Sequence, residues 1–260
     1  MLVDNDMSYS ILNLSGGGHI AYHRYAGVEP GVIFCGGFSS DMTGTKAMRL
    51  DDWCRQRDQS FLRFDYQGHG ASSGRFEEGT IGSWTVDALA VLDRLTTGPQ
   101  ILVGSSMGGW IMLLLALARP ERIAGLVGVA CAADFTESML WQQLDAATQA
   151  RLRQDGVIYV PSCYPGENPY PITLRLIEEA RQHLLLERDG LPIHCPVRLL
   201  HGMRDPDVPW QNSVRVAEKL ASEDVRVLLV KDGEHRMSRD SDLKLLLELL
   251  AELIERAKNR

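Results

Sequence analysis

The sequence predicts an α/β protein, with a mostly parallel, twisted sheet flanked by helices and an inserted helical lid. Along most of the 260 residues, short apolar runs alternate with helical patterns, which is typical of βαβ units. The alternation breaks between about 134 and 191. A serine between glycines follows one apolar run, and an acid and a histidine follow two later runs. Because the carboxyl ends of parallel strands share one edge of a sheet, we expect these three side chains to meet there.

The first half of the chain is expected to form a hairpin and several strand–helix units. Tyr9–Leu14 and Ile20–Tyr25 flank a Gly-rich turn, which indicates two antiparallel strands. Apolar runs predict strands, and residues at helical spacing predict helices. The strands are expected at 31–35, 61–64, 101–103 and 123–130, and the helices at 43–57, 81–95 and 110–118.

The segment 134–190 is predicted to be a lid inserted into an α/β core of residues 1–133 and 191–260. It contains a helical run at 136–152, a proline-rich stretch at 157–170 and a second helical run at 172–186. A long crossover without a lid role is the alternative. Six apolar or aromatic residues of the segment either face an acyl group or pack a core: Met139, Leu140, Trp141, Tyr159, Tyr164 and Tyr170.

The chain after this segment resumes the alternation. Strands are expected at 197–201 and 225–230, and the leucine spacing at 243–254 predicts a closing amphipathic helix. We expect the crossovers between parallel strands to be right-handed.

Ser106 is the nucleophile candidate, because Gly104-Ser105-Ser106-Met107-Gly108 has the pattern G-x-S-x-G between a strand and a helix. This is the nucleophile elbow of α/β-hydrolases, in which a sharp turn exposes the serine beside a base. The helix that follows directs its N-terminus at the place where negative charge develops. Ser105 is expected to face away from the pocket. Since the pattern is short, a plain turn remains the alternative until an acid and a histidine are found.

His235 is the general-base candidate and Asp205 the acid that orients it. His235 follows the last predicted strand and precedes the last helix, and the order Ser, acid, His is the order of this fold. Asp205 occupies the acid position of H-G-x-x-D-x-x-V-P, and Pro206 restricts its backbone to extended geometry. Asp207 of the same loop is the alternative acid. The other six histidines lack this position in the pattern: His19, His23, His69, His183, His194 and His201.

The oxyanion hole is expected to combine two backbone N–H groups, those of Met107 and Phe38. Met107 follows the nucleophile, and Phe38 follows the Gly36-Gly37 pair after a predicted strand. Because the donor at 38 is a main-chain group, Phe38→Ala is expected to cost little, whereas Phe38→Pro removes the donor.

Composition excludes several classes of partner and cofactor. The net charge of −7 argues against nucleic acid or an anionic membrane surface, and no apolar run reaches the roughly 20 residues of a membrane span. The five cysteines are scattered and form no C-x-x-C or Cys/His cluster, so we expect no metal. Neither Gly-rich stretch matches a nucleotide-binding pattern, so we expect no cofactor. The first residues carry no targeting pattern, which favours a reducing, cytoplasmic compartment.

Several longer blocks carry a family resemblance: GVIFCGGFSSDMTGTKA, RFDYQGHGASSG, GPQILVGSSMGGW and CPVRLLHGMRDPDVPW, with the histidine at 235. The chain resembles the α/β-hydrolases described as mitochondrial palmitoyl-protein thioesterases and mycophenolic acid acyl-glucuronide esterases (α/β-hydrolase domain-containing protein ten), or their bacterial relatives. The resemblance implies a triad of Ser106, Asp205 and His235, and hydrolysis of acyl thioesters on protein cysteines and of acyl glucuronides. It also implies the mitochondrial matrix as a location if a presequence has been removed.

The sequence therefore predicts a cofactor-free serine hydrolase acting on a small-molecule ester or an acylated protein. A general carboxylesterase on small esters keeps the same triad and remains an alternative. A non-catalytic ligand-binding protein on this fold is a third possibility, since fold alone does not fix function. The sequence does not indicate an oligomeric state.

Overall fold

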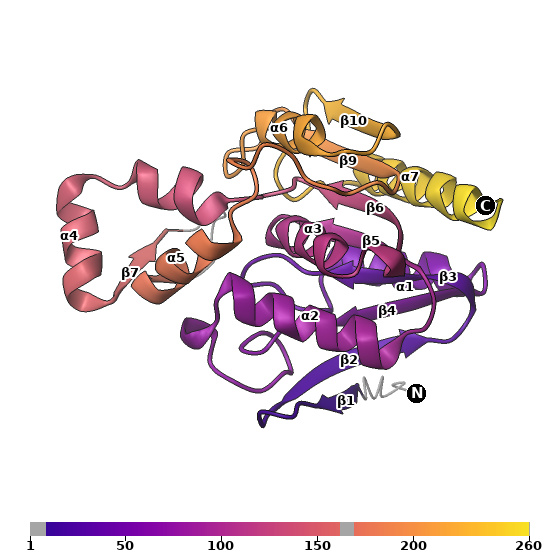
Figure 1. Ribbon diagram of the computed structural model, residues 1–260, viewed down its shortest axis with the longest axis horizontal. Coiled ribbons are helices and arrows are strands. Elements are labelled where there is room, and N and C mark those ends of the chain that lie inside the picture. Colours follow the sequence, from indigo (N-terminus) through magenta and orange to yellow (C-terminus); the bar gives the residue numbers. More distant parts are fainter. Residues whose placement is uncertain (1–8, 162–168, 260) are drawn as a thin grey trace, which may run out of the picture.

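The computed structural model describes residues 9–161 and 169–259. They form an eight-stranded sheet with helices on both faces and a smaller unit that projects beside it (Figure 1). The main elements, in chain order, are β1 (Ser10–Asn13), β2 (His19–Tyr25), β3 (Val28–Cys35), α1 (Thr45–Arg55), β4 (Gln59–Phe64), η1 (Phe76–Glu78), α2 (Ile81–Leu95), β5 (Gln100–Ser105), α3 (Met107–Ala118), η2 (Pro120–Arg122), β6 (Ile123–Val129), β9 (Val197–Gly202), α6 (Gln211–Lys219), β10 (Val225–Val230) and α7 (Asp240–Lys258).

The strands of the sheet follow the order β1-β2-β4-β3-β5-β6-β9-β10. β1 and β2 form the predicted antiparallel hairpin, and β2 also pairs antiparallel with β4. All pairs from β4 to β10 are parallel. The carboxyl ends of β3, β5, β9 and β10 therefore lie along one edge. The chain is an α/β-hydrolase in fold, as the sequence predicts.

Two hydrophobic layers hold the sheet, one on each face. In the buried strand β5, alternate residues point to opposite layers: Leu102 packs with α2 and α3, whereas Val103 packs with α1 and α7. α3 is apolar almost all round, and every residue from Met107 to Ala116 is buried. Because α3 begins next to Ser106 and runs through the core, the turn at Ser106 is anchored on both sides.

The segment between β6 and β9 forms the projecting unit on the left of Figure 1. It contains η3 (Thr136–Leu140), η4 (Trp141–Gln143), α4 (Ala146–Asp155), β7 (Val157–Val160), β8 (Tyr170–Thr173), α5 (Leu174–Ala180) and η5 (Arg181–His183). β7 and β8 pair antiparallel. Four buried side chains form a core of its own: Leu152, Ile158, Ile172 and Ile177.

The predicted secondary structure of this segment is partly wrong. The run 136–152 is not one helix, because the Asp145 side chain accepts the N–H of Thr148 and starts α4 anew. The second helix begins at Leu174 and not at 172, because Thr173 caps α5 and the residues before it belong to β8. The β7–β8 pairing and helix α6 were not predicted. No helix in the part of the chain that the structure describes is long and apolar enough to cross a bilayer.

Candidate active site

Ser106 occupies a sharp turn between β5 and α3. Its φ of 54° and ψ of −118° lie in a region that costs a non-glycine residue about 1–3 kcal/mol. Three hydrogen bonds hold this backbone in place: the Ser106 N–H donates to Val129 O (2.9 Å), and Ser106 O accepts the N–H groups of Gly109 (2.9 Å) and Ala132 (3.1 Å). Gly108 allows the close approach of β3, because a Cβ there would collide with the carbonyl of Cys35. The geometry is that of the predicted elbow.

His235 lies in the loop after β10, within bonding distance of Ser106. Its Nε2 is 3.0 Å from Ser106 Oγ, and its Nδ1 is 2.7 Å from Asp205 Oδ2. An ionised carboxylate only accepts hydrogen bonds, so Nδ1 carries the proton and Nε2 is free to accept from the serine. The arrangement is a continuous path from the Ser106 hydroxyl to the Asp205 carboxylate.

Asp205 is held by four hydrogen-bond donors. Its Oδ1 accepts the N–H groups of Asp207 (2.9 Å) and Val208 (2.8 Å), and its Oδ2 accepts from His235 and from His201 Nε2 (3.1 Å). Burial of this carboxyl, whose side chain is 1% exposed, would raise its pKa. The hydrogen bonds from the two histidines, the charge of His235 and the Val208 N–H outweigh burial and hold the pKa well below its usual range.

His201 is a functional neighbour that sequence analysis missed. It is fully buried on β9, and Ser213 Oγ lies 2.7 Å from its Nδ1. With Ser213 donating to Nδ1, Nε2–H points at Asp205 and at Val208 O (3.0 Å). The signal was present in the sequence, because His201 is the first residue of the H-G-x-x-D pattern that identified Asp205.

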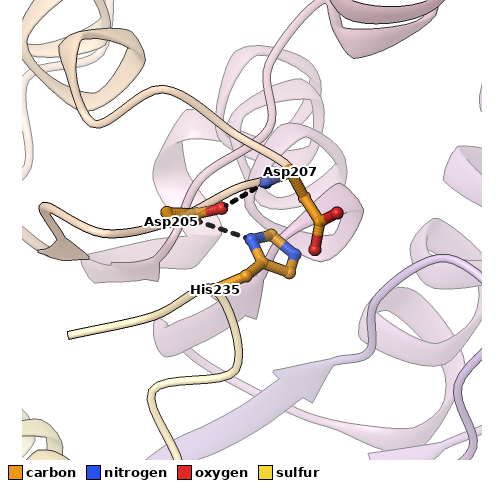
Figure 2. A group of neighbouring side chains, drawn as sticks. All are labelled: Asp205, Asp207 and His235. Atoms are coloured by element: carbon orange, nitrogen blue, oxygen red, sulfur yellow. Dashed lines mark hydrogen bonds and ion pairs between the residues drawn. The ribbon is translucent and has the colours of Figure 1, made fainter. Parts of the chain in front are cut away.

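Asp205, Asp207 and His235 form a group whose ligand atoms lie within 4.8 Å of one another (Figure 2). Figure 2 shows two bonds, both to the Asp205 carboxylate, and none to the carboxylate of Asp207. A carboxylate offers about four lone-pair sites, and the four donors to Asp205 occupy them. The group therefore does not fit a metal site, and Asp207 presents its carboxylate to the cavity.

The sequence predicts that two N–H groups, those of Met107 and Phe38, form an oxyanion hole. Met107 is the first residue of α3, where an N–H has no partner within the helix. Phe38 follows Gly36-Gly37 at the end of β3, and a Cβ at Gly37 would lie 3.5 Å from Ser106 Cβ. Among the described residues the Phe38 N–H has no hydrogen-bond partner. Met107 and Gly37 thus border Ser106, and Phe38 is the residue that follows Gly37.

A cavity of about 890 Å³ opens over Ser106 and His235. The part of its lining that the inserted segment contributes is apolar and is called the apolar end here; it includes Phe135, Met139, Leu140, Tyr170 and Ile172. Of the six side chains proposed to face an acyl group, Met139, Leu140 and Tyr170 line this cavity. Trp141 instead packs against the core of the insert, Tyr159 is 65% exposed, and Tyr164 lies outside the described residues.

The part of the lining that comes from α1 and the His235 loop is polar and is called the polar end here. The Lys46 ammonium donates to the Arg236 carbonyl oxygen and lies 3.5 Å from Ser238 Oγ. Burial, and then the charge of Arg236, lower the pKa of Lys46 to about 8. Ser105 is also among the residues that line the cavity, and of the two serines only Ser106 bonds to His235.

The four cysteines that the structure describes do not line this cavity. Cys35 and Cys131 are core residues, and burial raises the pKa of both thiols to about 12. Cys163 lies outside the described residues.

Comparisons with known proteins show the family and the fold to which this chain is similar. A family model described as serine aminopeptidase, S33 (Hydrolase_4) matches residues 29–162. The mouse palmitoyl-protein thioesterase ABHD10, a mitochondrial protein by its name, is 44% identical over 249 residues, which cover 96% of this chain and 83% of that protein. The structure of mouse α/β-hydrolase domain-containing protein 10 superposes with a TM-score of 0.90, at 44% identity, over 96% of this chain and 99% of that one. A putative hydrolase from Agrobacterium vitis matches with a TM-score of 0.90 at 38% identity, over 95% and 98% of the two chains.

Proposed function

This chain belongs to the α/β-hydrolase family of the ABHD10 palmitoyl-protein thioesterases, and from that premise we propose that it cleaves acyl thioesters and esters through an acyl-enzyme on Ser106. Membership of the family makes it a hydrolase. The observation that carries the catalytic assignment is the pair of distances from His235, 3.0 Å to Ser106 Oγ and 2.7 Å to Asp205 Oδ2.

Acylation begins when Ser106 Oγ attacks the carbonyl carbon of the acyl group and its proton passes to His235 Nε2. Asp205 keeps the imidazole in the tautomer that accepts this proton and stabilises the imidazolium that results. The N–H groups of Phe38 and Met107 stabilise the oxyanion of the tetrahedral intermediate. The bond to the leaving sulfur or oxygen then breaks, and His235 gives its proton to that atom.

Deacylation reverses these roles with water as the nucleophile. Water gives a proton to His235 as it attacks the acyl carbon, and the bond from that carbon to Ser106 Oγ breaks. The proton returns to Ser106, and the free acid leaves.

A long acyl chain is the proposed substrate feature, as in the name of the relatives. The apolar end of the cavity supports this, because every buried methylene contributes about 0.8 kcal/mol to binding. The polar end near Lys46 would then take the leaving group, a protein cysteine in a thioester or a sugar in an acyl glucuronide. A carboxylesterase for small esters is the alternative, and acyl-chain selectivity separates the two.

The segment 134–190 is proposed to act as the lid of this site. Its support is that residues of η3 and β8 form much of the apolar cavity wall, while the core provides Ser106 and His235. The names of the relatives favour the mitochondrion as the compartment, with the bacterial cytoplasm as the alternative.

The test compares the purified wild-type chain with Ser106→Ala and, as a matched control, Ser105→Ala. A fluorophosphonate probe is expected to label the wild type and Ser105→Ala but not Ser106→Ala, because only Ser106 contacts His235. Acetyl, octanoyl and palmitoyl thioesters with a common leaving group then give kcat/KM against chain length. Labelling of Ser106→Ala at the wild-type rate would contradict the catalytic assignment. Preference for acetyl by orders of magnitude would replace the long-chain thioesterase with the carboxylesterase.

A further inference from the structure

We infer that Phe135 and Tyr170 of the inserted segment are positioning residues for the oxyanion hole, acting through the ring of Phe38. The insert then influences the rate of the chemical step as well as substrate binding. This inference rests on the proposed function of Ser106 and of the Phe38 N–H.

The ring of Phe38 is surrounded by four aromatic rings from two parts of the molecule. On the core side its centroid lies 4.8 Å from Phe76 and 5.9 Å from Trp84. On the insert side it lies 5.7 Å from Phe135, which immediately precedes η3, and 6.0 Å from Tyr170 of β8. All four contacts are edge-to-face, within the separation at which aromatic pairs attract.

Phe38 is also a side chain where the two hydrophobic cores meet. It packs against the main core beneath α2 and α3 and against the small core of the insert. Of the apolar side chains that pack on these clusters, Phe38 and Leu140 contact both. A change in the insert therefore reaches Phe38 directly.

The backbone at Phe38 depends on its ring for placement. It follows two glycines, whose backbones have no side chain to fix them, and it lies beyond the last pairing of β3. The turn after it is held by Ser40, whose N–H and hydroxyl both donate to Gly37 O. That turn fixes the loop next to Phe38 but makes no bond to the Phe38 N–H. The four rings are thus the contacts that set where this N–H points.

The same three rings, Phe38, Phe135 and Tyr170, line the apolar end of the cavity. An acyl chain lying there packs against the rings that hold Phe38. For a short acyl group, which does not reach them, the rings alone must position the donor. A short substrate consequently reports on the positioning without a contribution from acyl-chain binding.

The experiment measures kcat and KM on acetyl thioester for Tyr170→Ala, with Tyr170→Phe as the conservative variant and Tyr159→Ala as the control from the same insert. Removal of an oxyanion donor costs about 10²–10³ in turnover, and we expect a misplaced donor to cost about tenfold in kcat with KM unchanged. Tyr170→Phe keeps the ring and should keep the rate. Tyr159 is 65% exposed and does not touch Phe38, so Tyr159→Ala should match the wild type. If Tyr170→Ala lowers the melting temperature, Phe135→Leu and Tyr170→Leu are measured in its place.

A double-mutant cycle with Phe38→Ala tests whether Tyr170 acts through Phe38. Phe38→Ala keeps the main-chain donor but removes the ring, and we expect it to lower kcat about tenfold. Tyr170→Ala should cause no further loss of kcat in the Phe38→Ala background. The inference would be overturned if Tyr170→Ala lowered kcat in the Phe38→Ala background by as much as it does in the wild type. A change confined to KM for palmitoyl thioester would also overturn it. Such a result leaves the proposed function intact as long as hydrolysis still requires Ser106, whereas turnover by Ser106→Ala removes both.

Discussion

Asp205 and Asp207 share one loop, yet their surroundings give them different chemistry. Asp205 is buried and receives four hydrogen bonds, which hold its pKa low, whereas the Asp207 carboxylate lines the cavity and bonds neither His235 nor Asp205. Only Asp205 can therefore fix the His235 tautomer and stabilise the imidazolium. Loss of the orienting acid typically lowers kcat by about 10⁴.

We expect Asp205→Ala to lose activity on that scale and Asp207→Ala to keep most of it. The measurement is kcat on the same thioester for both variants, with the melting temperature as a check on folding. The reverse result would exchange the two assignments. The two substituted residues lie two positions apart on the same loop, so each variant serves as the control for the other.

His69 is a buried titratable group whose Nε2 has no hydrogen-bond partner within the described residues. Its ring contacts Tyr66, Phe76 and Trp84, and its Nδ1 donates to Gln67 O at 3.4 Å. Burial lowers the pKa of His69 from 6.5 to about 4, only partly offset by the Gln67 carbonyl. Between these two pH values the unfolded chain binds a proton at His69 that the folded chain does not bind. The free energy of unfolding therefore falls as the pH falls from 6.5 to about 4.

His69→Phe should remove this pH dependence while keeping an aromatic ring in the cluster. Relative to the wild type, the free energy of unfolding of the variant is expected to rise by on the order of 3 kcal/mol between pH 6.5 and 4, because the pKa of His69 lies near 4 in the folded chain. Urea unfolding at a series of pH values measures this difference. Burial raises the pKa of Asp87 to about 6, so Asp87 makes the free energy of unfolding rise as the pH falls. Asp87 is present in the wild type and in the variant, so its contribution cancels in the difference. If the free energies of unfolding of the wild type and the variant differed by a constant amount between pH 6.5 and 4, His69 would not be the group that titrates.

At the scale of elements, short sequence patterns predicted the features that depend on residues close together in the chain. The run before Gly104 predicted β5, the glycine-flanked Ser106 predicted the elbow, and the ends of β9 and β10 predicted the meeting of Asp205 with His235. These predictions succeeded because parallel pairing brings strand ends to one edge whatever the rest of the chain does. The catalytic roles themselves remain predictions until they are measured.

Features that depend on contacts between distant segments were not predictable. The hydrogen bond from His201 to Asp205 depends on Ser213 of α6, which bonds the other ring nitrogen of His201. The rings that contact Phe38 likewise lie far from it in the sequence. In the insert, the helical pattern at 136–152 predicts one helix that continues through Asp145. The Asp145 side chain instead caps the start of a new helix, α4. The antiparallel pairing of β7 with β8 was not predicted, because the proline-rich stretch between the two strands masks the hairpin pattern in the sequence.

The whole molecule contains two hydrophobic bodies of unequal size. The sheet and its helices bury dozens of apolar side chains in two layers, whereas the insert has the four-residue core of Leu152, Ile158, Ile172 and Ile177. Regions with few buried apolar contacts open at a lower free energy than the global unfolding. The insert is therefore expected to open while the sheet stays folded, which is what a lid over the cavity requires.

A matched pair of substitutions tests this division, because Leu102 and Leu152 are both fully buried, the first in β5 and the second in α4. A buried Leu→Ala change typically costs about 2–5 kcal/mol. Leu102→Ala should lower the global free energy of unfolding by that amount. Leu152→Ala should speed hydrogen exchange in α4, β7 and β8, while the amides of β5 keep their wild-type protection. Equal loss of protection in β5 and the insert for Leu152→Ala would mean that the two bodies unfold together, and the boundary proposed at 134–190 would then not separate a unit able to move over Ser106.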